Sequence, residues 1–180
     1  MPPSDVRASI IQAAIDLTIT DGWSDITMDR VAQRAGVSRQ TVYNEIGTKA
    51  DLARDMVQFE LGGFLAIVDA AFAEYPDPDM AVRRAAERVL DFGEHHPLLG
   101  VIVAGGASDL LALLTIDAEQ IRSAATAHLR HVHPQFTAAF TDVVVRLILS
   151  YLTQPSPVAR DHLDAVISAM VRHQSPHMQP

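Results

Sequence analysis

Residues 31–45 read VAQRAGVSRQTVYNE, and this stretch predicts two short helices joined by a tight turn. Gly36 permits the left-handed backbone conformation that ends a helix, and Ser38 is a strong N-cap for the helix that follows. Val37 and Val42 are apolar where the second helix would pack against its neighbours. The pattern is that of a helix-turn-helix, a motif whose second helix enters the major groove of DNA.

The solvent face of the predicted second helix carries side chains that suit duplex DNA. Glutamine and asparagine pair with adenine, arginine pairs with guanine, and the threonine methyl group contacts thymine. Tyrosine, threonine and lysine commonly bind phosphates, and the starts of helices favour anions. We therefore predict a DNA-contact set consisting of Thr27, Ser38, Arg39, Gln40, Thr41, Tyr43, Asn44 and Lys49.

Outward from this stretch, apolar residues recur with helical spacing along nearly the whole chain. The spacing predicts helices over residues 4–20, 27–34, 38–46, 49–73, 80–95, from 97 onward, 117–131, 135–152 and 158–173. Thr27, Ser38 and Thr48 stand where N-caps are expected. The predicted fold class is all-α, with a three-helix DNA-binding head at residues 1–48 and a helical body for effector binding and dimerisation at residues 49–180.

Composition excludes several classes of protein. The chain has 180 residues and a formal net charge of −8, so it is no uniformly basic nucleic-acid coat. The charge is uneven, because residues 1–50 carry five basic and six acidic side chains, whereas residues 51–180 carry nine and sixteen. The absence of cysteine excludes disulfides, thiolate metal sites and a cysteine nucleophile.

Residues 10–52 resemble the DNA-binding head of the tetracycline-repressor (TetR) family of bacterial transcription regulators. The matching residues are Ile11, Ala13, Ala14, Leu17, Gly22, Ile26, Thr27, Met28, Val31, Ala32, Ala35, Gly36, Val37, Ser38, Thr41, Val42, Tyr43, Lys49, Ala50, Asp51 and Leu52. The resemblance implies a homodimer that binds a palindromic operator in double-stranded DNA, most often as a ligand-responsive repressor. It also implies that the body dimerises through its last two long helices and binds an effector.

Three residues depart from the pattern of the family. Glu45 stands where the family often has histidine or tyrosine, and an acid beside phosphates is unfavourable unless it points away or pairs with a neighbour such as Lys49. Ile46 replaces a frequent phenylalanine, and Gln40 replaces a small residue, which marks Gln40 as a specificity residue. Residues 38–45 are similar to actinobacterial members associated with alkane-oxidation genes.

The last two predicted helices carry more apolar residues than one narrow stripe needs, which favours burial on two sides. The dimer interface predicted from them comprises Phe136, Phe140, Val144, Leu147, Ile148, Tyr151, Val166, Ile167 and Met170, with packing inside one chain as the alternative. A small apolar effector is expected in the body. The residues considered for its pocket, with plain core as the alternative, are Phe59, Phe64, Val68, Phe92, Leu99, Ile102 and Val103.

Other functions find less support in the residues. His128 and His131 share a helix face, but no thiolate accompanies them, so we predict no metal site and no cofactor. The motifs of hydrolases and phosphate-binding loops are absent, so we predict no enzyme. The chain shows no leader-like start and no uninterrupted apolar run of about 18 residues, so we expect a cytoplasmic protein without a membrane partner. The alternative function is a helical dimer that binds a small molecule or a metal and whose head no longer binds DNA.

Overall fold

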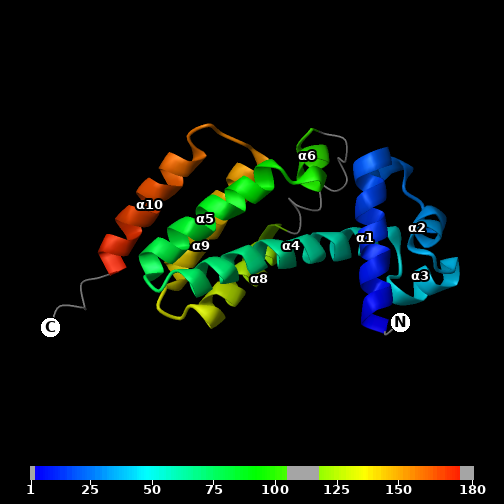
Figure 1. Cartoon of the computed structure of the whole chain (residues 1–180), viewed down its shortest axis with the longest axis horizontal. Helices are drawn as coiled ribbons and strands as arrows, with labels where there is room; N and C mark the ends of the chain where they lie inside the picture. The colour runs from blue at the N-terminus through cyan, green and yellow to red at the C-terminus, as the bar shows by residue number, and fades with distance from the viewer. Residues whose placement is uncertain (1–2, 105–117, 175–180) are drawn as a thin grey trace. The chain divides into compact units, whose positions relative to one another are not determined.

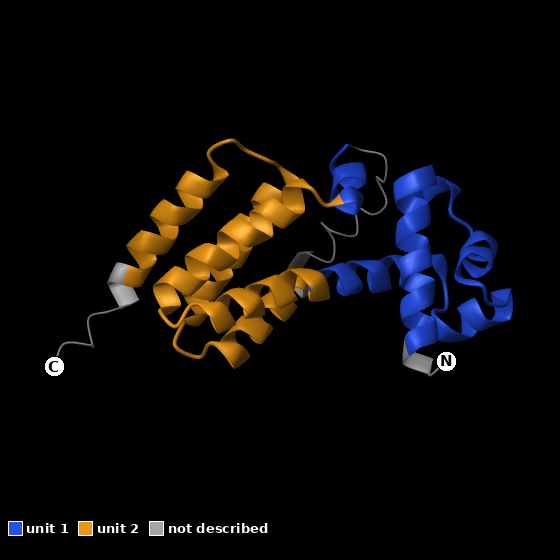
Figure 2. Ribbon diagram, viewed as in Figure 1, with its two compact units in different colours: residues 1–61, 97–118 blue, residues 62–96, 119–180 orange. Residues whose placement is uncertain are grey.

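The computed structural model describes residues 3–104 and 118–174, and these are helical apart from short turns and linkers (Figure 1). No strand occurs in these two ranges, which confirms the predicted all-α class. The described helices begin and end within about three residues of the predicted limits, except that residue 117 lies outside the description. The chain divides into unit 1, residues 1–61 and 97–118, and unit 2, residues 62–96 and 119–180 (Figure 2).

Unit 1 contains the predicted head and one helix from much later in the chain. Its elements are α1 (Pro3–Asp21), the 3₁₀ turn η1 (Trp23–Asp25), α2 (Met28–Ala35), α3 (Arg39–Glu45), the first part of α4 (Lys49–Glu74) and α6 (Pro97–Val103). Helix α1 packs against α2, α3 and α6. The apolar core of the unit includes Ile10, Ala14, Trp23, Val31, Val42, Leu52, Met56, Leu98 and Ile102.

Helix α4 meets the length and composition of a membrane span, and only 11% of its most apolar window is buried within the chain. Its first turns nevertheless contribute Leu52, Ala53 and Met56 to the core of unit 1, and each of the three side chains is buried there. A helix that begins in the core of a globular unit is better explained as part of that fold than as a membrane span.

The start of α4 is fixed by a reciprocal cap. The backbone N–H of Thr48 donates to the Asp51 carboxylate over 2.9 Å, and the backbone N–H of Asp51 donates to the Thr48 hydroxyl over 3.1 Å. This is a capping box with aspartate in place of glutamate. The hydrogen bonds from Thr48, followed by the one from Arg54, lower the pKa of the Asp51 carboxyl below its ordinary value.

Unit 2 is built on three helices that pack against one another: α5 (Pro78–Glu94), α9 (Ala138–Thr153) and α10 (Ala159–Gln174). Ion pairs join α5 to α10 at two places: Arg83 pairs with Asp164, and Arg160 pairs with Asp91 and Glu94. The core between the three helices consists of Val82, Ala86, Leu90, Phe140, Val144, Ala159, Leu163 and Ile167.

Helix α8 (Ala118–Val132) and the residue after it contact the later part of α4 through a polar and an aromatic contact. Nε2 of His128 lies 2.9 Å from the carboxylate of Asp69 in α4. Just past the end of α8, the buried ring of His133 stacks on Phe72 with 3.5 Å between ring centres. Nε2 of His133 has no hydrogen-bond partner in the described part of the chain. Burial lowers the pKa of His133, although the nearby Asp69 carboxylate opposes the shift.

His133 is expected to make the chain less stable as the pH falls. Its pKa is lowered in the folded chain, so the unfolded chain takes up the proton first as the pH drops below about 6.5. The free energy of unfolding should therefore decrease between about pH 7 and about pH 5, and less steeply in His133→Phe. Urea titrations at several pH values measure this, with His131→Phe as the control for losing one histidine. An equal slope in wild type and His133→Phe would refute the expectation.

Two glycines in open space are expected to respond in opposite ways to alanine. A Cβ added at Gly36 or at Gly62 would meet no atom within 4 Å, but only Gly36 has a positive φ, of 70°. Gly62→Ala should raise the free energy of unfolding by about 1 kcal/mol through helix propensity. Gly36→Ala should lower it by about 1–2 kcal/mol, because L-residues are strained at that φ. Urea unfolding of both variants checks the two signs.

Candidate nucleic-acid interface

Helix α3 is held at its start by the predicted cap. Gly36 adopts the left-handed conformation that ends α2, and the Ser38 side chain accepts from the backbone N–H of Thr41 over 3.0 Å. Thr27 caps α2 in the same way through the N–H of Arg30, at 3.3 Å. The three local predictions for the turn and its caps are confirmed. Val42 anchors α3 in the core of unit 1 with 0% of its surface exposed.

With Val42 buried, the opposite face of α3 is left to solvent. Tyr43 is 40% exposed, and Arg39, Gln40 and Asn44 are exposed as well, while Thr41 is half-buried. Ser38 and Thr27 are exposed at the two helix starts. Four of the eight residues predicted to contact DNA therefore share one accessible surface on α3, which we call the reading face: Arg39, Gln40, Tyr43 and Asn44.

Arg39 is held in place by two neighbours. Its guanidinium makes a two-pronged ion pair with Asp29 of α2, with N···O distances of 3.0 and 3.1 Å, and donates to the Tyr43 hydroxyl over 3.3 Å. The hydroxyl of Tyr43 and then the carboxylate of Asp29 raise the pKa of Arg39. Asp29 was not among the predicted residues. Its partner lies ten positions away on another helix, and no spacing rule links the two.

Gln40 and Asn44 form a second pair on the reading face. Nε2 of Gln40 donates to Oδ1 of Asn44 over 2.8 Å, one helical turn away. This contact does not use the Gln40 oxygen, an acceptor, or the Asn44 amide N–H groups, which are donors. Such a combination complements the acceptor and donor that adenine presents in the major groove.

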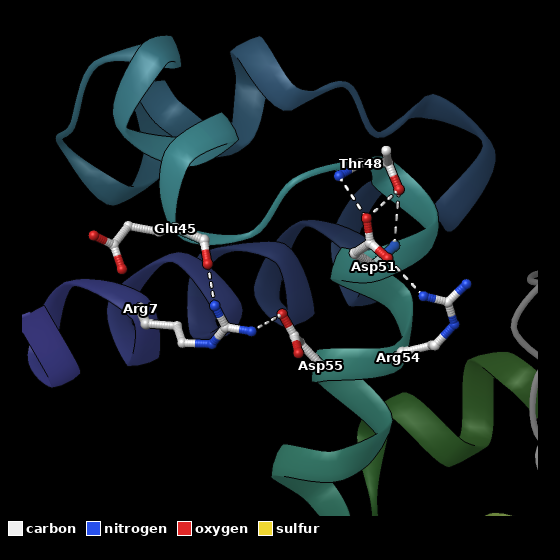
Figure 3. A network of polar contacts seen from close by, with 6 residues as sticks. All are labelled: Arg7, Glu45, Thr48, Asp51, Arg54 and Asp55. Atoms are coloured by element: carbon white, nitrogen blue, oxygen red, sulfur yellow. Dashed lines mark hydrogen bonds and ion pairs between the residues drawn. The ribbon is translucent and has the colours of Figure 1, made fainter.

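Lys49 is bound within unit 1. Its ammonium donates to the carbonyl oxygen of Trp23 over 2.9 Å and lies 4.7 Å from the centre of the Trp23 ring. The Glu45 carboxylate does not pair with Lys49; in Figure 3 its side chain points away from Arg7. Arg7, a residue that the sequence did not single out, binds the backbone carbonyl of Glu45 and the carboxylate of Asp55 (Figure 3).

The residues considered for an effector pocket fall into both units. Phe59, Leu99, Ile102 and Val103 belong to unit 1, where Ile102 is buried in the core and Phe59 and Val103 are exposed. Phe64, Val68 and Phe92 belong to unit 2, where Phe64 and Phe92 meet edge to face at 5.1 Å. The cavities found between α5, α9 and α10 are lined by none of these seven residues.

The residues predicted for the dimer interface fall into two groups within unit 2. One chain alone buries Phe140, Val144 and Ile167 in its core. The others are half-buried and keep part of their apolar surface; those beside that core are Phe136, Leu147, Ile148, Tyr151 and Met170, and the remaining one is Val166. In the described residues, no group of three or more histidine, aspartate or glutamate side chains has the geometry of a metal site.

A capped three-helix head with an accessible polar reading face, followed by a helical body, defines a helix-turn-helix DNA-binding transcription regulator. Residues 10–56 match the family model described as bacterial regulatory proteins, tetR family, and residues 77–172 match that of the bacterial tetracyclin repressor, C-terminal domain. The chain belongs to the TetR family, and it is a DNA-binding regulator of transcription. The resemblance seen in residues 10–52 is thereby confirmed and extended to the body.

Similar proteins are bacterial regulators of transcription. The chain is 33% identical over 171 residues to the HTH-type transcriptional regulator AlkX of Mycobacterium tuberculosis, covering 87% of this chain and 79% of that one. It is 28% identical to the HTH-type transcriptional activator FasR of Mycolicibacterium smegmatis, covering 53% and 43% of the two chains. Its fold matches the crystal structure of the TetR family repressor AlkX from Dietzia, with a TM-score of 0.74, 21% identity and coverage of 93% and 94%.

Proposed function

We propose that the chain acts as a homodimeric repressor that inserts α3 of each protomer into the major groove of a palindromic operator. The observation that carries this proposal is the reading face, on which base-reading and phosphate-binding side chains are exposed together. Gln40 and Asn44 read adenine, Arg39 contacts a base or the backbone, and Tyr43, Thr41 and Lys49 bind phosphates together with the helix starts at Thr27 and Ser38. Residues 1–48 form the DNA-binding domain and residues 49–180 the effector and dimer domain.

The direct experiment measures how tightly the chain binds DNA and how binding depends on salt. A duplex enriched by the chain from a random-sequence library is compared with poly(dI-dC) at several salt concentrations. Because the head is close to neutral, we expect it to release only a few counterions from DNA. Binding should therefore be sequence-selective, and its affinity should fall only moderately as the salt concentration rises. Failure to enrich any sequence would favour the alternative, a helical dimer whose head no longer binds DNA.

Tyr43→Ala is expected to weaken binding to all duplexes alike. A phosphate contact carries no sequence information, so its loss lowers affinity for the enriched duplex and for poly(dI-dC) by the same factor, roughly threefold to tenfold. Tyr43→Phe keeps the ring on which Arg39 packs and removes the hydroxyl, so it separates ring packing from the two hydrogen bonds of that hydroxyl, to the phosphate and from Arg39. A selective loss on the enriched duplex alone would assign Tyr43 to base reading.

Dimerisation through α9 and α10 is supported by the half-buried apolar residues beside the unit 2 core. Helices with apolar residues beyond one stripe are expected to be buried on more than one side. In a two-fold dimer, the same surface of the partner chain would cover this one. Analytical ultracentrifugation tests this: Ile148→Glu should shift the chain toward monomer, while Ala139→Glu, an exposed site on the same helix, serves as the matched control.

The effector is proposed to be a small apolar molecule that favours the arrangement of heads that does not bind DNA. The apolar body and the similarity to the two AlkX proteins support this class, and the Dietzia protein is implicated in biodegradation of n-alkanes. Release of the enriched duplex on addition of n-dodecane, with no release by an equal amount of a polar alcohol, is the expected result. Acting on chromosomal operators, the regulator would work in the cytoplasm.

A further inference from the structure

One guanidinium joins three helices of unit 1. Arg7 of α1 donates through one nitrogen to the backbone carbonyl of Glu45, the last residue of α3. Through its other nitrogen it makes an ion pair of 2.7 Å with Asp55, in the second turn of α4. Figure 3 shows the Arg7 side chain reaching between the end of α3 and α4. These contacts lie 38 and 48 residues apart in sequence, so no local motif reveals them.

At the carboxyl end of α3, the next residue, Ile46, packs in the unit 1 core and its backbone N–H bonds back to Val42 over 2.9 Å. Arg7 adds a side-chain contact that joins this end to both α1 and α4. Helix α3 has seven residues and buries Val42 alone among them, so few of its own side chains fix its orientation. At its start, Arg39 ties it to Asp29 of α2. At its end, the carbonyl of Glu45 belongs to the last turn, where carbonyl groups have no partner within the helix. The positive charge of Arg7 also suits the negative end of the helix dipole.

The partner of Arg7 determines which way the guanidinium points. The Asp55 side chain is 22% exposed, so it is screened less from Arg7 than a surface carboxylate would be. Arginine can bind a carboxylate and a carbonyl at the same time because its guanidinium is planar and its N–H donors have fixed directions. The ammonium of lysine is a point charge and does not reproduce this geometry. A change in the direction of the first turns of α4 therefore moves Arg7, and with it the end of α3.

We propose that Arg7 is a positioning residue for DNA reading: it sets the orientation of α3 relative to α4, and Asp55 holds it in place. This inference rests on the proposed DNA-reading role of α3. It adds that sequence discrimination depends on a residue of α1 that is not part of the reading face.

The experiment separates positioning from stability by using four variants of the full chain. Arg7→Ala removes both contacts. Arg7→Lys keeps the positive charge opposite Asp55 but loses the planar guanidinium, and Asp55→Asn removes only the carboxylate that binds Arg7. Arg34→Ala is the matched control, because Arg34 makes an ion pair of 3.2 Å that joins α2 to α1. Each folded variant is titrated with the enriched duplex and with poly(dI-dC), and discrimination is the ratio of the two affinities.

Arg7→Ala is expected to lower discrimination about tenfold or more, as for loss of a hydrogen bond to a charged group, with affinity for poly(dI-dC) nearly unchanged. Arg7→Lys should restore the melting temperature but not discrimination, and Asp55→Asn should fall between the two. Unchanged discrimination in folded Arg7→Ala, or full rescue by lysine, would overturn the inference.

A second readout needs no DNA and so keeps this inference distinct from the proposed function. Amide hydrogen exchange in α3 should accelerate in Arg7→Ala and Asp55→Asn, while exchange in α2 stays at the wild-type rate. Equal acceleration in α2 and α3 would show a general loss of stability and would count against positioning. If the wild-type chain enriches no sequence, but amide exchange in the two variants accelerates in α3 alone, the DNA-reading proposal fails. The role of Arg7 in positioning α3 would then still be supported.

Discussion

Phe140→Ala is expected to lower the free energy of unfolding of the chain by about 3–5 kcal/mol, the largest effect of any substitution considered for this protein. Phe140 is 2% exposed, and its ring stacks on Phe136 with 4.8 Å between centres. It stands in the core shared by α5, α9 and α10. Alanine would remove the whole ring and leave a cavity that three packed helices can close only in part.

Urea unfolding at two protein concentrations measures this effect and distinguishes packing inside one chain from packing at a dimer interface. Loss of a residue inside one chain lowers stability equally at both concentrations, whereas loss at a dimer interface shifts stability with concentration. Leu147→Ala is the comparison, because Leu147 is half-buried on the same helix and is proposed to face the partner. A loss in Phe140→Ala that vanishes at high concentration would place Phe140 at the interface.

Gln40→Ala is expected to reduce discrimination between the enriched duplex and its single-base variants by about 1–3 kcal/mol, which is about 5-fold to 150-fold. The loss should be concentrated at one A·T pair in each half-site, since Gln40 and Asn44 present one joint hydrogen-bonding edge. Gln33→Ala removes the same type of exposed side chain from α2 and should leave discrimination unchanged.

The double variant Gln40→Ala, Asn44→Ala tests whether the two side chains act together. Because the Gln40 amide donates to Asn44, either single change should already disrupt the edge, and the double change should cost less than the sum. Losses that add within about 0.5 kcal/mol would mean that the two residues read separate bases.

The sequence predicted the head well because its signals are local. Ser38 and Thr27 cap the next turn, Gly36 ends a helix by its own conformation, and Val42 is the apolar residue on a polar helix. Each signal acts within four residues. The prediction failed to find Asp29 and Arg7, whose roles depend on which helices come together, and the sequence could not show that Lys49 would bind the Trp23 carbonyl.

The body was harder to predict for a related physical reason. Helical periodicity shows that a face is apolar but not what it packs against. Ile102 was considered for an effector pocket, yet α6 packs on α1 and buries Ile102 in unit 1. Phe140 and Leu147 lie on the same apolar helix, and only the structure separates the residue buried by its own chain from the one that retains surface.

The position of Trp23 makes intrinsic tryptophan fluorescence specific to unit 1. Trp23 is its only tryptophan, 4% exposed in unit 1 with the Lys49 ammonium against its ring. Intrinsic fluorescence therefore reports on unit 1, whereas circular dichroism at 222 nm sums over every helix of both units. A denaturation curve recorded in both channels separates the melting of the DNA-reading unit from that of unit 2 without a label, and coincident curves would identify a single cooperative transition.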